Sequence, residues 1–363
     1  MGDIVEILEC QLCGCKDLTT YLDLGFSPLA NSLKKTVDEA EFEAPLEVVK
    51  CENRECQCFQ LRHLVNPEIL FSNYSYRSSY GLKNHFEEYA KTTSEFFNLI
   101  PHDFIVGIGG NTGLLEKEYK NLGYSHILNV EPAKNIALEA EHSGVPTYNC
   151  FFDELVANNL ATTWMYGQAK LITCNNCWAH TDPKPLIEGI KILLDKEGCL
   201  VIENAYWLNS IQNLDVFQCY HEHKFYHHIK GLKNFFDIHG FDLFKVTYNS
   251  VQCGSFRIFV KWKENTKFEI DKSVEEAIKN EEEFGLFKKE TYSNLLDELD
   301  NLSAEIHVEL KKTKDSGKTI GLFGIAAKSV LFLKYFGIAD YISFATDDSD
   351  LKWDRFIPGT SIK

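Results

Sequence analysis

Residues 104–114 read Phe-Ile-Val-Gly-Ile-Gly-Gly-Asn-Thr-Gly-Leu, an apolar run that opens into a glycine-rich turn. Such a run predicts a buried β-strand, and residues 115–122 after the turn predict a helix. Residues 126–131 follow as a second apolar strand that ends in an acid, Glu131. Together they predict the first βαβ unit of a doubly wound sheet, whose ligand crevice lies at the carboxyl ends of the strands. An acid at that strand end typically hydrogen-bonds the ribose hydroxyls of a nucleoside cofactor.

The glycine spacing misses the strict dinucleotide pattern. Gly107, Gly109 and Gly113 give G-x-G-x-x-x-G, one residue longer than G-x-G-x-x-G. This spacing argues against a nicotinamide cofactor. The alternative is that the glycines only form a tight turn and bind no ligand. Further segments of the same sheet are predicted as strands at 170–174, 199–203, 243–248 and 256–262, with a helix at 183–195.

Length and charge limit the possible functions. The chain has 363 residues, which predicts two or three domains. It carries 53 acidic and 37 basic side chains, a net charge of −16, without a Lys/Arg-rich stripe. Binding to nucleic acid or to an anionic membrane is therefore not expected. The N-terminus does not read as a secretory signal, and no apolar run is long enough to span a bilayer, so we expect a cytoplasmic protein.

Half of the twelve cysteines fall within the first 58 residues. In a cytosolic chain, clustered cysteines bind metal more often than they form disulfides. Two pairs supply the four thiolates of a closed structural zinc site: Cys10, Cys13, Cys51 and Cys56. Cys15 and Cys58 lie just outside these pairs, and a set of packed, reduced cysteines is the alternative. We expect the zinc to hold together a loop-rich segment over residues 1–65.

Two histidine-bearing segments stand out. Asn175-Asn176-Cys177-Trp178-Ala179-His180 follows a predicted strand and so lies at the mouth of the crevice. Tyr220-His221-Glu222-His223 is the second, with Tyr226, His227 and His228 just beyond it. Its spacing is not that of a zinc protease, whereas imidazole titrates near neutrality and suits acid/base work. A surface patch of histidines and aromatics is the alternative.

The last hundred residues predict a second, smaller unit. Residues 265–318 are strongly charged and helical in period, which is typical of a solvated helix face. A strand and glycine turn at 319–324 lead to Lys328, and another strand is expected at 341–345. This βαβ unit could hold a phosphate near Lys328, on a sheet that is short or incomplete.

Taken in order, these segments resemble the S-adenosylmethionine-dependent sugar C-methyltransferases, which act on nucleotide-linked keto-deoxysugars. The motifs that carry the resemblance are the two cysteine pairs and residues 28–31, 74–79, 107–113, 130–132, 151–152, 176–180, 220–223, 254–257, 324–328 and 358–360. The resemblance implies an α/β fold in three parts. These are a small zinc-binding domain (1–68), a Rossmann-like class I methyltransferase domain (69–264) and a smaller α/β Rossmann-like domain for the substrate nucleotide (265–363).

The resemblance also implies a reaction: a base forms an enolate on a nucleotide-linked 4-keto-deoxysugar, and the ring carbon next to the ketone takes the methyl group of S-adenosylmethionine. Zinc takes no part in that reaction, and a monomer or weak dimer is expected. The catalytic residues it implies are His223 as the base, with His180, Tyr220, Glu222 and Tyr76. The cofactor-binding residues it implies are Gly107, Gly109, Gly110, Asn111, Gly113, Glu131, Pro132, Phe152 and Asn175. The substrate-binding residues it implies are Tyr74, Ser78, Ser79, Asn176, Arg257 and Lys328.

The chain departs from the family pattern in the cofactor loop. The family usually places acids where this chain has Gly107 and Thr112, and the first of these helps to hold the methionine end of the cofactor. Phe217 also replaces a usual acid, and the chain ends earlier than the family pattern. Loss of one charged hydrogen bond costs about 1.5–3 kcal/mol. The second hypothesis is therefore a non-methylating binder of nucleotide sugars, and a third is a nicotinamide-dependent sugar oxidoreductase.

Overall fold

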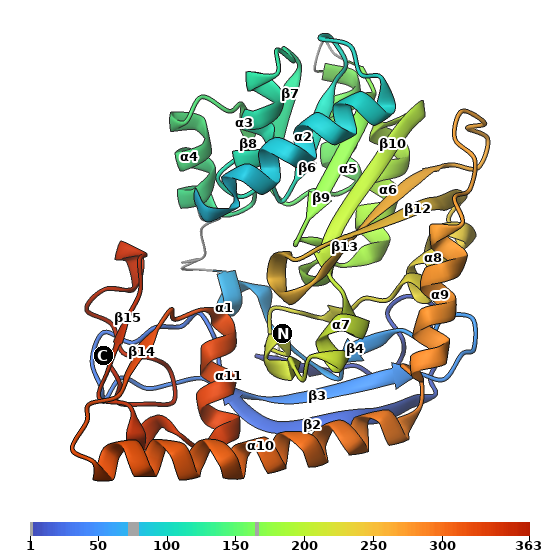
Figure 1. Cartoon of the computed structure of the whole chain (residues 1–363). Coiled ribbons are helices and arrows are strands. Elements are labelled where there is room, and N and C mark those ends of the chain that lie inside the picture. The colour runs from blue at the N-terminus through green and yellow to red at the C-terminus, as the bar shows by residue number, and fades with distance from the viewer. Residues whose placement is uncertain (1–2, 72–79, 164–166) are drawn as a thin grey trace.

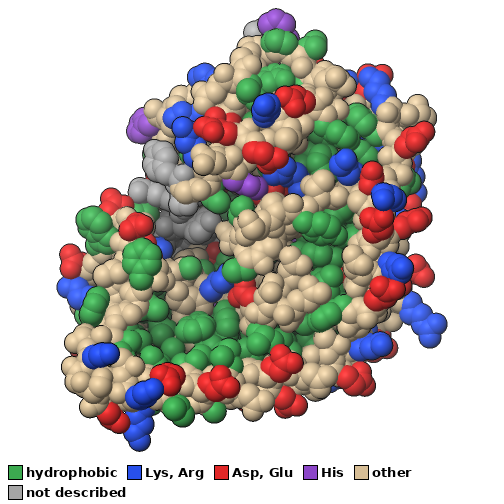
Figure 2. All heavy atoms as spheres, in the orientation of Figure 1, with side chains coloured by type: hydrophobic (Ala, Val, Ile, Leu, Met, Phe, Trp, Pro, Cys, Tyr) green, Lys and Arg blue, Asp and Glu red, His purple; other side chains and the backbone are tan. Residues whose placement is uncertain are grey.

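The computed structural model describes residues 3–71, 80–163 and 167–363 (Figure 1). A seven-stranded sheet flanked by helices forms one end of the molecule, and a four-stranded sheet lined by the long helix α10 forms the other. Within the described ranges, no helix is both long and apolar enough to cross a membrane. On the face shown in Figure 2, lysine and arginine side chains are scattered among acidic ones.

The seven-stranded sheet has the order β12-β13-β10-β9-β6-β7-β8. Its strands are β6 (Ile105–Ile108), β7 (Ile127–Val130), β8 (Thr147–Tyr148), β9 (Ala169–Asn175), β10 (Leu194–Ala205), β12 (Phe241–Asn249) and β13 (Ser255–Trp262). The pairs from β8 to β10 are parallel, and β13 runs antiparallel between β10 and β12. The predicted doubly wound sheet is confirmed, because these apolar runs are buried on both faces as in other parallel sheets.

Helices cover this sheet on both sides. They are α2 (Lys83–Phe97), α3 (Leu114–Asn121), α4 (Lys134–His142), α5 (Glu154–Thr163), α6 (Pro183–Leu193) and α8 (Ile229–Ile238). The predicted helices at 115–122 and 183–195 are confirmed as α3 and α6. Helix α6 begins where the Asp182 side chain accepts from the Lys184 N–H, with proline at its first position. Helix α2 was not predicted, and it buries Phe86 and Tyr89 beside α3.

The N-terminal segment contains more regular structure than expected. The four-stranded sheet has the order β11-β4-β3-β2, and β1 pairs separately with β5. The strands are β1 (Ile4–Glu6), β2 (Leu18–Pro28), β3 (Glu43–Cys51), β4 (Phe59–Leu61), β5 (His63–Val65) and β11 (Phe225–Tyr226), followed along the chain by the short helix α1 (Pro67–Phe71). The expectation of a loop-rich segment is therefore wrong. Part of the reason is that β11 comes from the middle of the chain and pairs with β4, a partner that local sequence cannot reveal.

The C-terminal part contains three α-helices and a two-stranded parallel sheet. Its elements are α9 (Ser273–Phe284), α10 (Lys289–Asp315), β14 (Gly321–Phe323), α11 (Ala327–Phe336) and β15 (Phe344–Thr346). The predicted small βαβ unit with a short sheet is confirmed. Phe217 packs against Phe332 and Phe336 of α11, which joins this part to the histidine-bearing segment. The remaining short helices are α7 (Trp207–Gln212) and 3-10 turns at Tyr80–Leu82, Trp178–His180, Val216–Gln218, Val251–Cys253, Ala339–Tyr341 and Asp350–Lys352.

Candidate active site

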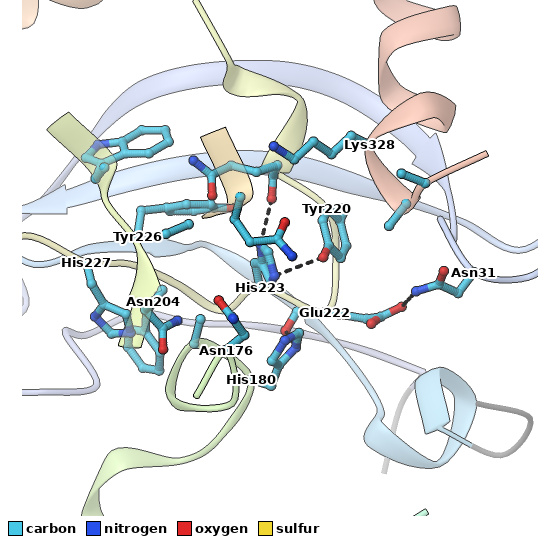
Figure 3. A pocket seen from close by; sticks show the side chains of 18 residues that line it. Asn31, Asn176, His180, Asn204, Tyr220, Glu222, His223, Tyr226, His227 and Lys328 are labelled. Atoms are coloured by element: carbon cyan, nitrogen blue, oxygen red, sulfur yellow. Dashed lines mark hydrogen bonds between the residues drawn. The ribbon is translucent and has the colours of Figure 1, made fainter. Parts of the chain in front are cut away.

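A buried pocket gathers the two histidine-bearing segments (Figure 3). The predicted site residues that line it are Asn176, His180, Tyr220, Glu222, His223 and Lys328. They come from the end of β9, the loop before β11 and the first turn of α11, and Asn31 joins them from the N-terminal segment. The structure therefore brings together residues that are up to 297 positions apart in the chain (31 to 328).

The hydrogen bonds of His223 fix its tautomer. Its Nδ1 lies 2.8 Å from the Gln218 carbonyl oxygen, which can only accept, so Nδ1 carries the proton. Nε2 therefore presents a lone pair, which accepts from the Tyr220 hydroxyl at 2.9 Å. Burial, with the neighbouring His180, lowers the pKa of His223 well below its ordinary value. At neutral pH this side chain is an uncharged acceptor held next to a phenol.

His180 has the same character. Its Nδ1 donates to the Glu222 carbonyl oxygen at 2.9 Å, which leaves Nε2 as an acceptor. Burial lowers the pKa of His180 to about 4, and its ring centroid lies 4.8 Å from that of His223. A neutral acceptor can orient a hydroxyl group, but it offers no proton to an oxyanion. Stabilisation of negative charge in this pocket must therefore come from other groups.

Glu222 connects the pocket to the N-terminal segment. Its Oε1 accepts from the Asn31 amide at 2.5 Å. Burial raises the pKa of the Glu222 carboxyl to about 7, so close to neutral pH both protonation states are populated. The carboxyl can thus accept from or donate to a bound hydroxyl.

Lys328 supplies the positive charge of the pocket. Its Nζ lies 2.6 Å from Asp215 Oδ2 and 3.5 Å from the Cys253 sulfur. The lysine stands in the first turn of α11, whose N-terminal end favours anions. An anionic group bound here would share Lys328 with Asp215.

The predicted cofactor loop forms a tight turn at the carboxyl end of β6. Gly109, Asn111 and Gly113 all have positive φ, at 64°, 54° and 71°. A Cβ on Gly109 would lie 2.7 Å from the Cβ of Cys177, so only glycine fits there. The Glu131 carboxylate accepts from the Asn111 N–H at 3.0 Å and the Ala133 N–H at 2.9 Å. Burial raises the pKa of Glu131, while these two hydrogen bonds oppose the shift.

The other predicted cofactor residues surround this turn. Asn175 ends β9 and accepts from the Tyr89 hydroxyl at 3.1 Å, and Pro132 follows Glu131. Phe152 lies against α6, where a Cβ on Gly189 would come within 2.7 Å of its ring. A glycine-rich turn and an acid at the next strand end match what a nucleoside cofactor requires. The residues present therefore fit S-adenosylmethionine.

Some predicted substrate residues are placed elsewhere. Arg257 is buried on β13, where it binds Glu203 at 2.9 Å and stacks 3.8 Å above the Tyr89 ring. It is not among the residues that line the pocket, so its contact with substrate stays a prediction. The predicted residues that lie outside the described ranges are Tyr74, Tyr76, Ser78 and Ser79.

Other polar residues of the pocket were not predicted as site residues. Asn204 and His227 both line it, and within the described chain Asn204 Oδ1 and His227 Nε2 are buried without a hydrogen-bond partner. Asn204 stands near the carboxyl end of β10, next to Glu203. Asn204 could have been predicted from its position near the carboxyl end of a strand, because Asn175 was predicted from such a position.

The four predicted zinc ligands cluster as expected. The sulfurs of Cys10, Cys13, Cys51 and Cys56 all lie within 4.8 Å of one another. The Cys10–Cys56 and Cys13–Cys51 sulfur pairs are each 3.6 Å apart. Four thiolates at 2.3 Å from a tetrahedral zinc would be about 3.8 Å apart. The donor set and its spacing therefore fit a closed zinc site.

Comparisons with known proteins cover the whole chain. A C-methyltransferase C-terminal domain model matches residues 250–363, and a zinc binding domain model matches residues 10–71. C-methyltransferase NovU of Streptomyces niveus is 30% identical over 369 residues, which span 100% of this chain and 86% of NovU.

Two solved methyltransferase structures are similar to about half of this chain. Magnesium protoporphyrin IX methyltransferase from Synechocystis PCC 6803 is 12% identical with a TM-score of 0.38, over 52% of this chain and 89% of that one. An S-adenosylmethionine-dependent methyltransferase from Clostridium acetobutylicum ATCC 824 is 12% identical with a TM-score of 0.39, over 54% of this chain and 95% of that one.

Proposed function

Since this chain belongs to the S-adenosylmethionine-dependent C-methyltransferase family, we propose that its substrate is a nucleotide-linked 4-keto-deoxysugar. The methyl group goes to the ring carbon next to the ketone, after a base has formed the enolate. The observation that carries this proposal is the pair of neutral imidazoles, His180 and His223, in a buried pocket that also contains Lys328.

The base step follows from the tautomer of His223. Its unprotonated Nε2 takes the proton from the ring carbon, and the C–H electron pair becomes the carbon–carbon double bond of the enolate. Nε2 has a single lone pair, so the substrate must displace the Tyr220 hydroxyl from it before the proton can be transferred. The displaced hydroxyl then donates to the developing enolate oxygen, so proton removal and charge stabilisation occur together.

The other pocket residues orient the sugar. Nε2 of His180 accepts from a ring hydroxyl, while the amides of Asn176 and Asn204 can donate to sugar oxygens. S-adenosylmethionine supplies the electrophilic methyl group when it is bound. The glycine turn and Glu131 hold that cofactor at the carboxyl ends of β6 and β7, across from the pocket segment that follows β9.

The nucleotide diphosphate lies at the N-terminal end of α11. Lys328 and the positive N-terminal end of the α11 dipole attract its negative charge. Asp215, which pairs with Lys328 at 2.6 Å, fixes the position of its ammonium group. None of the twelve cysteines forms a disulfide, and four of them cluster as zinc ligands, which supports a cytoplasmic location.

The test combines methyl transfer with proton exchange. Zinc-loaded protein is incubated with S-adenosylmethionine and a panel of keto sugar nucleotides, and products are analysed by mass spectrometry. In D2O with S-adenosylhomocysteine, the wild type should exchange the proton next to the ketone, and His223→Gln should not. A folded wild type that binds S-adenosylhomocysteine but neither methylates nor exchanges any sugar of the panel would contradict the proposal. Such a result would favour the non-methylating binder.

A further inference from the structure

A buried carboxylate lies directly beneath the glycine turn. Glu116, in the first turn of α3, is only 2% exposed. A Cβ on Gly107 would overlap its Oε1 and lie 2.7 Å from its Cδ. A Cβ on Gly110 would lie 2.9 Å from the same oxygen. The carboxyl group of Glu116 therefore occupies the space into which a side chain at position 107 would extend.

This carboxyl group is only partly satisfied. Its Oε2 is buried without a hydrogen-bond partner among the described residues, and so is Oδ1 of Asn129, which also lies against Gly110. Burial raises the pKa of Glu116 to about 7, and the negative charge of Glu131 contributes to the same shift. Two buried acceptors at one turn, without a donor, are costly unless a bound group supplies the donor.

We propose that Glu116 is the anionic group of the cofactor site, and that its carboxylate pairs with the ammonium group of the methionine part of S-adenosylmethionine. The inference rests on the cofactor of the proposed function. The inference adds that the acid of the cofactor site comes from α3, below the turn, because β6 has a glycine at position 107. The glycines at 107 and 110 then leave the space that this carboxylate needs.

The proposal predicts a charge change on binding. An ammonium near Glu116 favours the ionised carboxylate, so a fraction of the protein must release a proton when the ligand binds at pH 7. A purely structural carboxyl group would stay in its original protonation state. Glu118 on the same helix is a matched control, because it is also buried but accepts from Asn121 at 3.0 Å.

Calorimetry with two ligands provides the test. S-adenosylhomocysteine has the ammonium group, and 5′-methylthioadenosine lacks the amino-acid part. We expect Glu116→Gln to weaken S-adenosylhomocysteine binding roughly 10- to 150-fold and to leave 5′-methylthioadenosine binding unchanged. Titrations in buffers of different ionisation enthalpy should show proton release for the wild type and for Glu118→Gln, but not for Glu116→Gln.

Placing an acid at position 107, where the family pattern usually has one, provides an independent test. Gly107→Glu alone should abolish binding, since its side chain would collide with Glu116. The double variant Gly107→Glu/Glu116→Ala should recover most of the affinity for S-adenosylhomocysteine. The inference is overturned if Glu116→Gln weakens both ligands equally, weakens neither, or keeps the proton release. A wild type that binds neither ligand would instead overturn the cofactor assignment itself, and the two failures are thereby distinguished.

Discussion

Removal of the zinc should reduce methyl transfer without reducing cofactor affinity. Cys56→Ser deletes one of the four clustered sulfurs, and Gln57 is the next residue. The Gln57 carbonyl oxygen accepts from Nε2 of His228 at 3.0 Å, and the N–H of Leu61 donates to the Lys224 carbonyl oxygen at 2.9 Å. These bonds hold the residues that directly follow His223 against the zinc-binding segment.

The size of the effect follows from these two hydrogen bonds. At about 0.5–1.5 kcal/mol each, their loss would destabilise the docked segment by about 1–3 kcal/mol. That corresponds to a decrease of about 5- to 150-fold in the population of the competent pocket. Glu131 and the glycine turn belong to the other sheet, so the affinity for S-adenosylhomocysteine should stay unchanged.

The assay compares kcat/KM for methyl transfer with calorimetric binding of S-adenosylhomocysteine, and metal analysis establishes the zinc content. Cys15→Ser is the matched control, because Cys15 is outside the cluster of four sulfurs. It should keep both zinc and turnover. A folded, zinc-free Cys56→Ser protein with full turnover would refute the reasoning, as would a parallel loss of cofactor affinity.

Further substitutions and pH changes separate the remaining roles. His223→Gln should lower turnover about 100- to 10,000-fold and keep S-adenosylhomocysteine affinity; an equal loss of both would point to misfolding. Glu131→Gln can satisfy only one of two backbone N–H groups, so S-adenosylhomocysteine affinity should fall roughly 10- to 150-fold by calorimetry. Lys328→Gln should raise KM for the sugar nucleotide about tenfold at unchanged cofactor affinity. The folded-state pKa of His180 is lowered to about 4, so its contribution to stability is complete above pH 6.5 and is lost as pH falls towards 4. The thermal midpoint should fall over that range, and less steeply for His180→Asn.

Segments whose structure depends on local sequence were predicted correctly. Strand β6 is four apolar residues, all buried, followed by glycines that must adopt positive φ. The two cysteine pairs were found for a similar reason, because the spacing within each pair is itself the constraint imposed by the metal. Periodicity and spacing are enough where a residue's neighbours in sequence are also its partners in space.

Contacts between distant segments were not predictable in this way. Strand β11 is two residues long, and it is a strand only because β4 lies beside it. Arg257 pairs with Glu203, which lies 54 positions earlier in the chain, and no local pattern predicts that pair. Glu116 lies in the charged sequence Leu-Leu-Glu-Lys-Glu-Tyr-Lys, where an acid normally faces solvent. Nothing in that sequence indicates that this one is buried under the turn.

The weakness of the base has a consequence for specificity under the proposed function. Backbone carbonyls, not carboxylates, hold Nδ1 of both His180 and His223, so neither imidazole is made more basic by a charged partner. Burial then lowers both pKa values. A base of this kind can remove a proton only from a carbon that a neighbouring ketone has already acidified, and only while Tyr220 stabilises the enolate. Sugars that carry a hydroxyl in place of the ketone would bind in the same pocket and remain unreacted. The pocket therefore selects its substrate through the acidity of the reacting carbon as well as through shape.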